Sequence, residues 1–313
     1  MKLCNSTNVL FGIVIICLVS ALPGRLVAAN EQRFSVPQAA VDALKAAVQA
    51  TDTNALHAIF GAAGHSLVSA DVVEADFERE LFMRRVKEKI NLASESDSKE
   101  TLQLGADSWP FPIPLVKQDG QWHFDTEGGR EEILNRRIGA NELGAIRVCR
   151  AYVQAQHEYA SVDRNGDGVP EYARHLRSTP GTHDGLYRTR RTGDELSPLG
   201  PLVAQARVEG YRQQTRILTD DGSPYHGYYF TILTQQGKHA AGGKYNYIIK
   251  GHMIAGFALV ALPAEWGNTG VMTFTVNQQG KVYQKNLGPK TASIAGAIAV
   301  YDPDNTWTLA PEE

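Results

Sequence analysis

One short loop carries the side chains best suited to hold a metal ion. Its potential oxygen ligands are Asp163, Asn165, Asp167, Val169 through its carbonyl, and Glu171. This spacing, with Gly168 at the sharp turn, matches the first half of the calcium loop of an EF-hand. The twelfth position is Arg174 and not the bidentate glutamate that completes such a loop, so a full EF-hand is excluded. Two interpretations remain open: an incomplete Ca²⁺ loop, or a solvated loop of Asx turns that needs no metal.

A cluster of aromatic residues in the last third of the chain is a second candidate site. Its members are Tyr225, His226, Tyr228 and Trp266, with Tyr229 and Asn268 close by in sequence. Tyrosine and tryptophan offer a large contact area with a polar tip, which suits a peptide or a glycan. The alternative is structural, because aromatic residues that alternate along a strand usually form core contacts and cross-strand pairs.

Histidines are the remaining residues with metal-binding chemistry. They are His175, His183, His226, His239 and His252, with Asp184 and Glu265 as potential carboxylate partners. If they converge, they predict a metal-dependent hydrolase; the alternative is that they are separate surface or loop residues. Other enzyme signatures are missing: residues 64–68 read GHSLV and lack the last glycine of Gly-x-Ser-x-Gly, and there is no His-Glu-x-x-His. We therefore expect a non-catalytic protein, with a hydrolase of envelope polymers as the alternative.

The acidic loop follows a predicted amphipathic helix that runs from Gly139 to about Ser161. Ile146, Cys149, Val153 and Ala160 recur at helical spacing and predict a face packed on a sheet. Asn141 is the predicted N-cap, with Glu142 in the first turn. Gln156 is the one polar residue on the apolar side, so burial would require a hydrogen-bond partner. Cys149 is predicted to be a buried structural thiol.

The first 29 residues have the features of a cleavable signal peptide. Lys2 precedes an apolar run from Val9 to Leu22, and small residues end the segment at Ala29, the predicted cleavage point. A retained membrane anchor would need a longer apolar stretch than this one, which Arg25 ends. We expect a secreted or periplasmic protein with no membrane span after cleavage. A net charge of −3, from 31 basic and 34 acidic residues, indicates no nucleic-acid partner, so an envelope protein, a peptide or a glycan is expected.

The pattern of elements predicts an α+β protein. Helices are expected at 37–48, 55–60 and 71–89, with Val72 and Phe77 among the apolar positions of the third. Strands follow at 101–104, 109–116 and 121–125, then a polar helix or linker at 127–137. The second part is expected to hold a long loop at 178–198, a short helix at 199–209, strands at 228–233, 245–249, 257–261, 270–276 and 281–285, and a helix at 292–300. The predicted division is a signal peptide at 1–29, an N-terminal module at 30–135 and a second module at 136–313.

Several motifs resemble known families. The hairpin DGQWHFD after helices resembles the nuclear-transport-factor-two-like and cystatin-like folds. The motifs VDRNGDGVPEYA, PLGPLVAQA, SPYHGYYFTILTQQG, GGKYNYIIKGHMIAGFALVALPAEWGNTGVMTFTVNQQGKVYQKNLGP and YDPDNTW resemble domain-of-unknown-function family 2950, a set of secreted bacterial proteins. That resemblance spans nearly the whole chain after the signal peptide and implies no particular activity.

Residues 136–313 also resemble the globular domains of type IV pilins and pseudopilins. The resemblance implies a long helix packed on an antiparallel sheet, and some pseudopilins hold Ca²⁺ in a loop. The chain departs from a pilin at its N-terminus, where the apolar segment is a predicted cleavable signal and the pilin-type start is missing. Filament assembly is therefore not expected, and only the fold analogy is kept.

Overall fold

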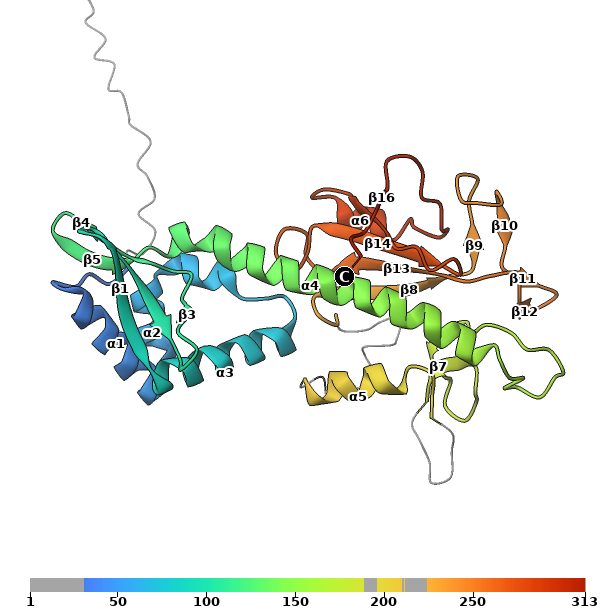
Figure 1. The fold of residues 1–313 in the computed structure, drawn as a ribbon, viewed down its shortest axis with the longest axis horizontal. Coiled ribbons are helices and arrows are strands. Elements are labelled where there is room, and N and C mark those ends of the chain that lie inside the picture. Colours follow the sequence, from blue (N-terminus) through green and yellow to red (C-terminus); the bar gives the residue numbers. More distant parts are fainter. Residues whose placement is uncertain (1–30, 189–195, 210, 212–223, 313) are drawn as a thin grey trace, which may run out of the picture.

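A computed structural model describes residues 31–188, 196–209, 211 and 224–312. The predicted signal peptide and parts of the predicted 178–198 loop lie outside the described residues. The fold is α+β, as predicted, with helices and mainly antiparallel sheets. Two separate hydrophobic cores lie at the two ends of one long helix, α4 (Thr126–Tyr159), which runs across the molecule (Figure 1). We call residues 31–125 the N-terminal lobe and residues 160–312 the C-terminal lobe; α4 belongs to both.

The N-terminal lobe packs helices against a five-stranded sheet. Its helices are α1 (Pro37–Ala50), α2 (Thr53–Phe60), the 3₁₀ helix η1 (Ala62–Leu67) and α3 (Val72–Glu88). Its strands are β1 (Ile90–Ser96), β2 (Lys99–Leu104), β3 (Trp109–Pro110), β4 (Leu115–Gln118) and β5 (Gln121–Phe124), in the order β1-β2-β4-β5 with β3 on β2. The three predicted helices and the Asp119–Gly120 hairpin are confirmed, whereas β1 was not predicted. Of the apolar residues of α3, Val86 is buried and Phe82 packs against the N-terminal core, whereas Val72 and Phe77 are exposed.

The helix α4 begins 16 residues earlier than predicted, at Thr126 and not after Asn141. Its true N-cap is Asp125, whose carboxylate accepts a hydrogen bond from the Gly128 N–H at 2.9 Å. Asn141 is buried in the middle of the helix, and Glu142 accepts hydrogen bonds from the backbone N–H groups of Val271 and Met272. Asparagine resembles a cap in sequence, but here its amide serves a distant segment. The predicted boundary between residues 135 and 136 falls within this continuous helix.

The C-terminal lobe packs α4 against a five-stranded antiparallel sheet. The sheet has the order β16-β15-β14-β13-β8, from β8 (Tyr228–Leu233), β13 (Ala258–Pro263), β14 (Met272–Asn277), β15 (Tyr283–Asn286) and β16 (Thr308–Leu309). Cys149, Tyr152, Phe257 and Phe274 are fully buried between helix and sheet. Gln156 is also fully buried, and its amide bonds both the N–H and the C=O of Ala173 at 2.8 Å. The expected partner for this polar residue therefore exists, and Cys149 is a core thiol as predicted.

Smaller elements surround this sheet. They are the parallel pair β6 (His175–Arg177) and β7 (Gly185–Tyr187), the helix α5 (Gly200–Val208), the strands β9 (Gln235–Gln236), β10 (Tyr245–Asn246), β11 (Ile248–Ile249) and β12 (His252–Met253), and the helix α6 (Thr291–Ala295). The predicted strand at 245–249 is divided between β10 and β11, and β11 pairs with β12 in a hairpin. The last predicted helix is shorter than expected, because α6 ends before Gly296. Within the described residues, no helix combines the length and the apolar character that crossing a lipid bilayer requires.

Candidate metal centre and aromatic cluster

The acidic loop begins where α4 ends, and Asp163 organises its backbone. The two carboxylate oxygens of Asp163 accept hydrogen bonds from the N–H groups of Gly166 and Gly168, each at 2.8 Å. Both glycines have positive φ, which glycine adopts without steric cost. The bonds from Gly168 and Gly166 hold the pKa of Asp163 below its usual range. Asp163 therefore acts inside the loop as an Asx-type turn residue, as the alternative to the calcium interpretation predicts.

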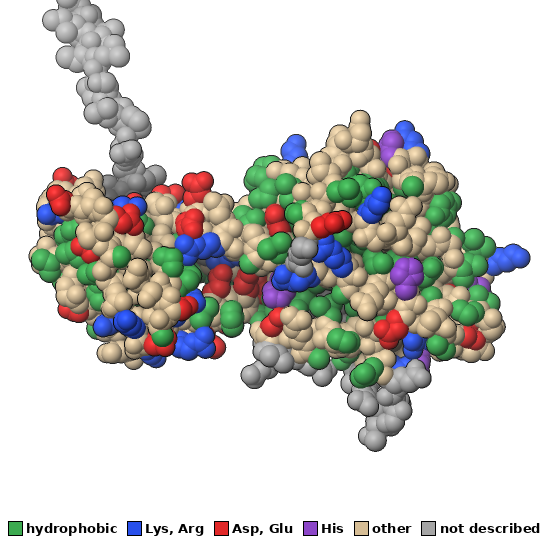
Figure 2. Space-filling view, viewed as in Figure 1, with side chains coloured by type: hydrophobic (Ala, Val, Ile, Leu, Met, Phe, Trp, Pro, Cys, Tyr) green, Lys and Arg blue, Asp and Glu red, His purple; other side chains and the backbone are tan. Residues whose placement is uncertain are grey.

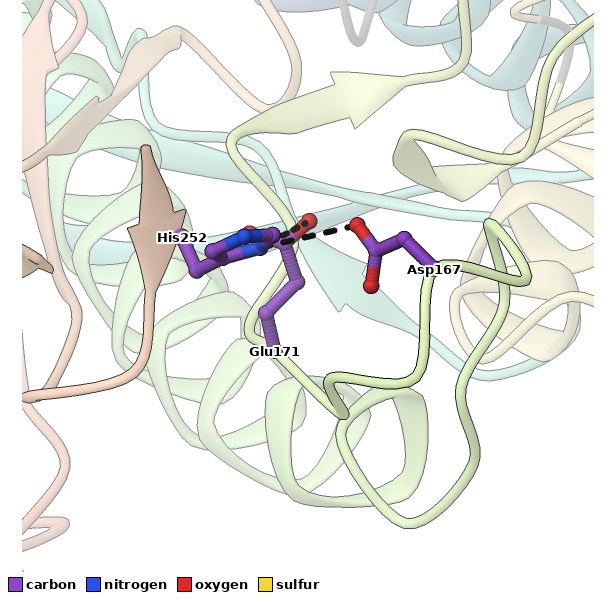
Figure 3. Close-up of side chains that lie close together, drawn as sticks. All are labelled: Asp167, Glu171 and His252. Carbon is purple, nitrogen blue, oxygen red and sulfur yellow. Dashed lines mark ion pairs between the residues drawn. The ribbon is translucent and has the colours of Figure 1, made fainter. Parts of the chain in front are cut away.

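Three other side chains converge beside this loop. They are Asp167 and Glu171 from the loop and His252 from β12, with one ligand atom of each within 4.8 Å of the others (Figure 3). The Nδ1 atom of His252 lies 3.6 Å from Asp167 Oδ2 and 3.8 Å from Glu171 Oε1. Among the described residues this is the one group of three histidine, cysteine or carboxylate side chains with such geometry.

Backbone contacts fix the loop against the β11–β12 hairpin. The Met253 N–H donates to Glu171 Oε2 at 2.9 Å, and the Tyr172 N–H donates to the Met253 carbonyl at 2.8 Å. Glu171 therefore has one oxygen bound to the hairpin and the other facing His252. Val169 donates its N–H to Asp167 Oδ1 at 2.9 Å, which orients Asp167 so that Oδ2 points at the imidazole.

The side-chain amide of Asn165 joins the same two carboxylates. Its Nδ2 atom donates to Asp167 Oδ2 at 2.7 Å and to Glu171 Oε1 at 3.1 Å. Two facing carboxylate oxygens repel each other, so a donor or a cation between them is stabilising. The Asn165 amide supplies such a donor, so a divalent ion held by the imidazole and the two carboxylates would have to take the place of its N–H groups.

One atom of this centre lacks a conventional partner. His252 Nδ1 is buried and forms no hydrogen bond with any residue that the structure describes, since both carboxylates lie beyond hydrogen-bond distance. A buried polar atom without a partner calls for an explanation such as an ion. The imidazole nitrogen and the carboxylate oxygens suit a borderline transition ion such as Zn²⁺ or Mn²⁺, whereas Ca²⁺ prefers six to eight oxygens. No sequence pattern indicates that His252 approaches the loop, because it lies 81 positions after Glu171.

The other histidines do not join this centre in the part of the chain that the structure describes. His239 pairs with Asp302 at 2.9 Å, and His226 pairs with Glu209 at 3.0 Å. His183 contacts Arg188 at 2.5 Å. Asp184 bonds Thr179 and Thr182 in its own loop. The five histidines therefore do not converge, which agrees with the alternative that they are separate surface or loop residues, and only His252 among them lies in a potential metal centre.

The predicted aromatic site is divided in the structure. Tyr225 and His226 lie together, with ring centroids 4.3 Å apart, and both bond Glu209 Oε2 at 3.0 Å. Tyr228 is fully buried and donates its hydroxyl to the Met272 carbonyl at 2.8 Å. Trp266 donates its indole N–H to Asn286 at 3.0 Å. Tyr228 is thus a core residue, which agrees with the cross-strand alternative, and it cannot contribute to a surface site.

The residues 225–227 instead belong to a polar junction between the lobes. Tyr211 donates its hydroxyl to Asp71 Oδ2 at 2.8 Å and accepts a hydrogen bond from the His226 N–H at 3.1 Å. The Gly227 N–H also donates to Asp71 Oδ2, at 3.2 Å. Asp71 is the N-cap of α3, so the start of this helix is fixed to the C-terminal lobe. Neither Asp71 nor Tyr211 was predicted, since their connection depends on a contact between residues 140 positions apart.

Comparison with known proteins identifies a family but no relative of known role. The model of the family described as protein of unknown function (DUF2950) matches residues 31–310, which confirms the resemblance seen in the sequence motifs. No curated protein and no solved structure matches the chain.

Proposed function

We propose that this chain, which belongs to the DUF2950 family, is a secreted or periplasmic protein. Its proposed role is binding or structural support at the cell envelope. The predicted signal peptide at 1–29 supports export, and the missing catalytic motifs support a non-catalytic role. We further propose that the C-terminal lobe is pilin-like, which is supported by α4 packed on an antiparallel sheet. The helices and the β4–β5 hairpin of the N-terminal lobe support its likeness to the nuclear-transport-factor-two-like or cystatin-like folds.

The same proposal includes a structural divalent cation at Asp167, Glu171 and His252. The observation that carries it is the buried, unbonded Nδ1 atom of His252, directed at two carboxylates from a separate segment. An ion there would join the loop after α4 to the β11–β12 hairpin and so fix one end of the C-terminal core. The predicted Ca²⁺ loop, with Asp163 as a ligand, is the competing form of this site.

The test is thermal unfolding of the mature chain after chelation, with Zn²⁺, Mn²⁺ or Ca²⁺ added back. An ion at 100 times its dissociation constant stabilises the folded state by about 2.7 kcal/mol, and we expect the midpoint to rise by about 5 °C or more. His252→Gln and Asp167→Ala should abolish the rise, whereas the matched control His239→Gln should retain it.

The choice of ion distinguishes the two forms. A response to Zn²⁺ or Mn²⁺ that depends on His252 supports the mixed centre, and a response to Ca²⁺ that is lost in Asp163→Ala but kept in His252→Gln supports the oxygen-only loop. Identical midpoints in chelator and in all three ions would refute both.

A metal-dependent hydrolase of envelope polymers is the second candidate. It is favoured by the number of ligands, because three protein ligands leave a coordination position free, as in catalytic zinc sites. Asp167 is exposed, so a substrate could reach the centre. This candidate predicts turnover of a purified envelope polymer by the metal-loaded chain and its loss in His252→Gln; stoichiometric metal without turnover would leave the structural role.

A further inference from the structure

Three carboxylates occupy the beginning of α3, where this helix meets the C-terminal lobe. They are Asp71 at the N-cap, Glu74 in the first turn and Glu78 one turn later. Val73, from the same turn, packs against the C-terminal core. Acidic and basic side chains gather at the narrowing between the lobes (Figure 2). The contact between the lobes here is therefore largely polar.

The negative charges of Asp71 and Glu78 are each stabilised by several hydrogen-bond donors. Asp71 accepts hydrogen bonds from the N–H groups of Val73 and Glu74 as well as from Tyr211 and Gly227. Glu78 receives two guanidinium bonds from Arg137 on α4, at 2.9 and 3.3 Å. Both carboxylates therefore have several strong donors at hydrogen-bond distance.

The carboxylate of Glu74 has fewer donors, and none of those among the described residues is charged. Its bonded partners in the described residues are neutral: the Ser69 hydroxyl and the Asn141 amide, the latter at 3.4 Å. The same Asn141 amide nitrogen donates to the Thr269 carbonyl of the C-terminal lobe at 3.1 Å. Glu74 thus lies at the point where α3, α4 and the β13–β14 connection meet.

We propose that Glu74 is a proton-controlled latch between the two lobes. With its proton bound, Glu74 is a neutral neighbour of Asp71 and Glu78, and the lobes are held together. When it loses the proton, three negative charges face each other within two turns of α3, with Arg137 already engaged by Glu78 and Asn268. The junction between residues 68–78 and 225–229 then opens more often.

The charges and burial around Glu74 support the proposed latch. The pKa of Glu74 is raised to about 7, chiefly by burial and also by the charges of Glu78 and Asp71, whereas the Ser69 hydrogen bond and the charge of Arg137 act in the opposite direction. Among the described residues, other ionisable groups at the junction include Tyr211, Tyr225, His226, Glu209 and Glu265. Since the pKa is raised in the closed state, the stabilisation is complete below pH 4.5 and is lost as the pH rises through about 7.

Hydrogen exchange at pH 5 and pH 8, corrected for the intrinsic exchange rate, tests the latch in the mature chain. The Gly227 amide reports directly, because it donates to Asp71 across the junction. We expect its protection to fall about tenfold or more between the two pH values. Glu74→Gln should remove most of this dependence, whereas Glu80→Gln, an equal charge change on the exposed face of α3, should keep it.

Equal loss of protection in the native chain and in both variants would overturn the proposal, because His226 or another group would then be responsible. If Glu74→Gln does not fold, the titration of the Glu74 carboxyl carbon by NMR in the native chain decides. A midpoint near 7 supports the latch, and a midpoint near the ordinary 4.5 refutes it.

Discussion

Replacing Arg137 with methionine should weaken the connection between the lobes more than any single change on their surfaces. The side chain of Arg137 is 2% exposed, although it is charged. It donates two bonds to Glu78 on α3 and one, at 2.8 Å, to Asn268 in the β13–β14 connection. One guanidinium thus joins three segments, and methionine keeps most of its volume while removing every donor.

The expected loss follows from these contacts. Breaking a buried ion pair typically costs about 3–5 kcal/mol, because the remaining charge is left without a partner. Glu78 is 41% exposed and can be hydrated after the change, so the loss of this pair falls below that range. The Asn268 carbonyl oxygen also loses a donor from a charged group. Together these contacts give a destabilisation of about 2–3 kcal/mol.

Urea and thermal unfolding of the mature chain measure this loss. Arg130→Met is the matched control, because Arg130 lies two turns earlier on α4 and pairs with Glu127 at the exposed surface. That pair should contribute nothing measurable. A double-mutant cycle with Glu78→Gln isolates the coupling of the two side chains. If Arg137→Met unfolds at the same midpoint as Arg130→Met, or if the cycle shows no coupling, the interpretation of Arg137 as the bridge is refuted.

Two further predictions concern the C-terminal lobe. Gly227→Ala should destabilise the protein by about 2 kcal/mol or more in urea unfolding, because φ is +68° and a Cβ would lie 2.6 Å from Asn141 Nδ2 and 2.7 Å from Thr269 Cβ. An unchanged midpoint would contradict the close approach of these segments. Cys149 should resist iodoacetamide at pH 8 in the folded protein and react in urea, because the thiol is fully buried and burial raises its pKa to about 12. Modification of the native protein, read by mass spectrometry, would show that this core opens.

Elements governed by local chemistry could be predicted from the sequence. Pro37 at the first helical position, Asp52 as an N-cap and the Asp119–Gly120 turn determine structure within a few residues of themselves. Four strands of the C-terminal sheet, β8, β13, β14 and β15, follow from their runs of β-branched and aromatic residues, whereas β16 was not predicted. The short strands were not predicted correctly. A two-residue strand such as β10 or β11 is defined by its pairing with another strand and is too short to show a periodic sequence pattern.

The candidate site was predictable only in part, for a related reason. The spacing of Asp163, Asn165 and Asp167 indicated a turn-rich acidic loop, and the structure contains one. Spacing could not show that Asp163 would be used by backbone donors, nor that His252 would reach Asp167 and Glu171. Both depend on how the β11–β12 hairpin folds back over the loop, which is a tertiary contact.

The polar residues of α4 explain why this helix was predicted with the wrong beginning and why its two halves should behave differently. Arg137, Asn141 and Glu142 face other segments, so the helix is not simply amphipathic there, and a periodicity argument divides it. Beyond residue 144 the contacts are mainly apolar, with Cys149 and Tyr152 fully buried. Apolar packing is not directional and changes little with pH, whereas the polar half depends on aligned bonds and on ionised groups. The adjustable part of this fold is therefore the junction around Arg137 and Asn141, and motion of the N-terminal lobe relative to the sheet should begin there, not in the C-terminal core.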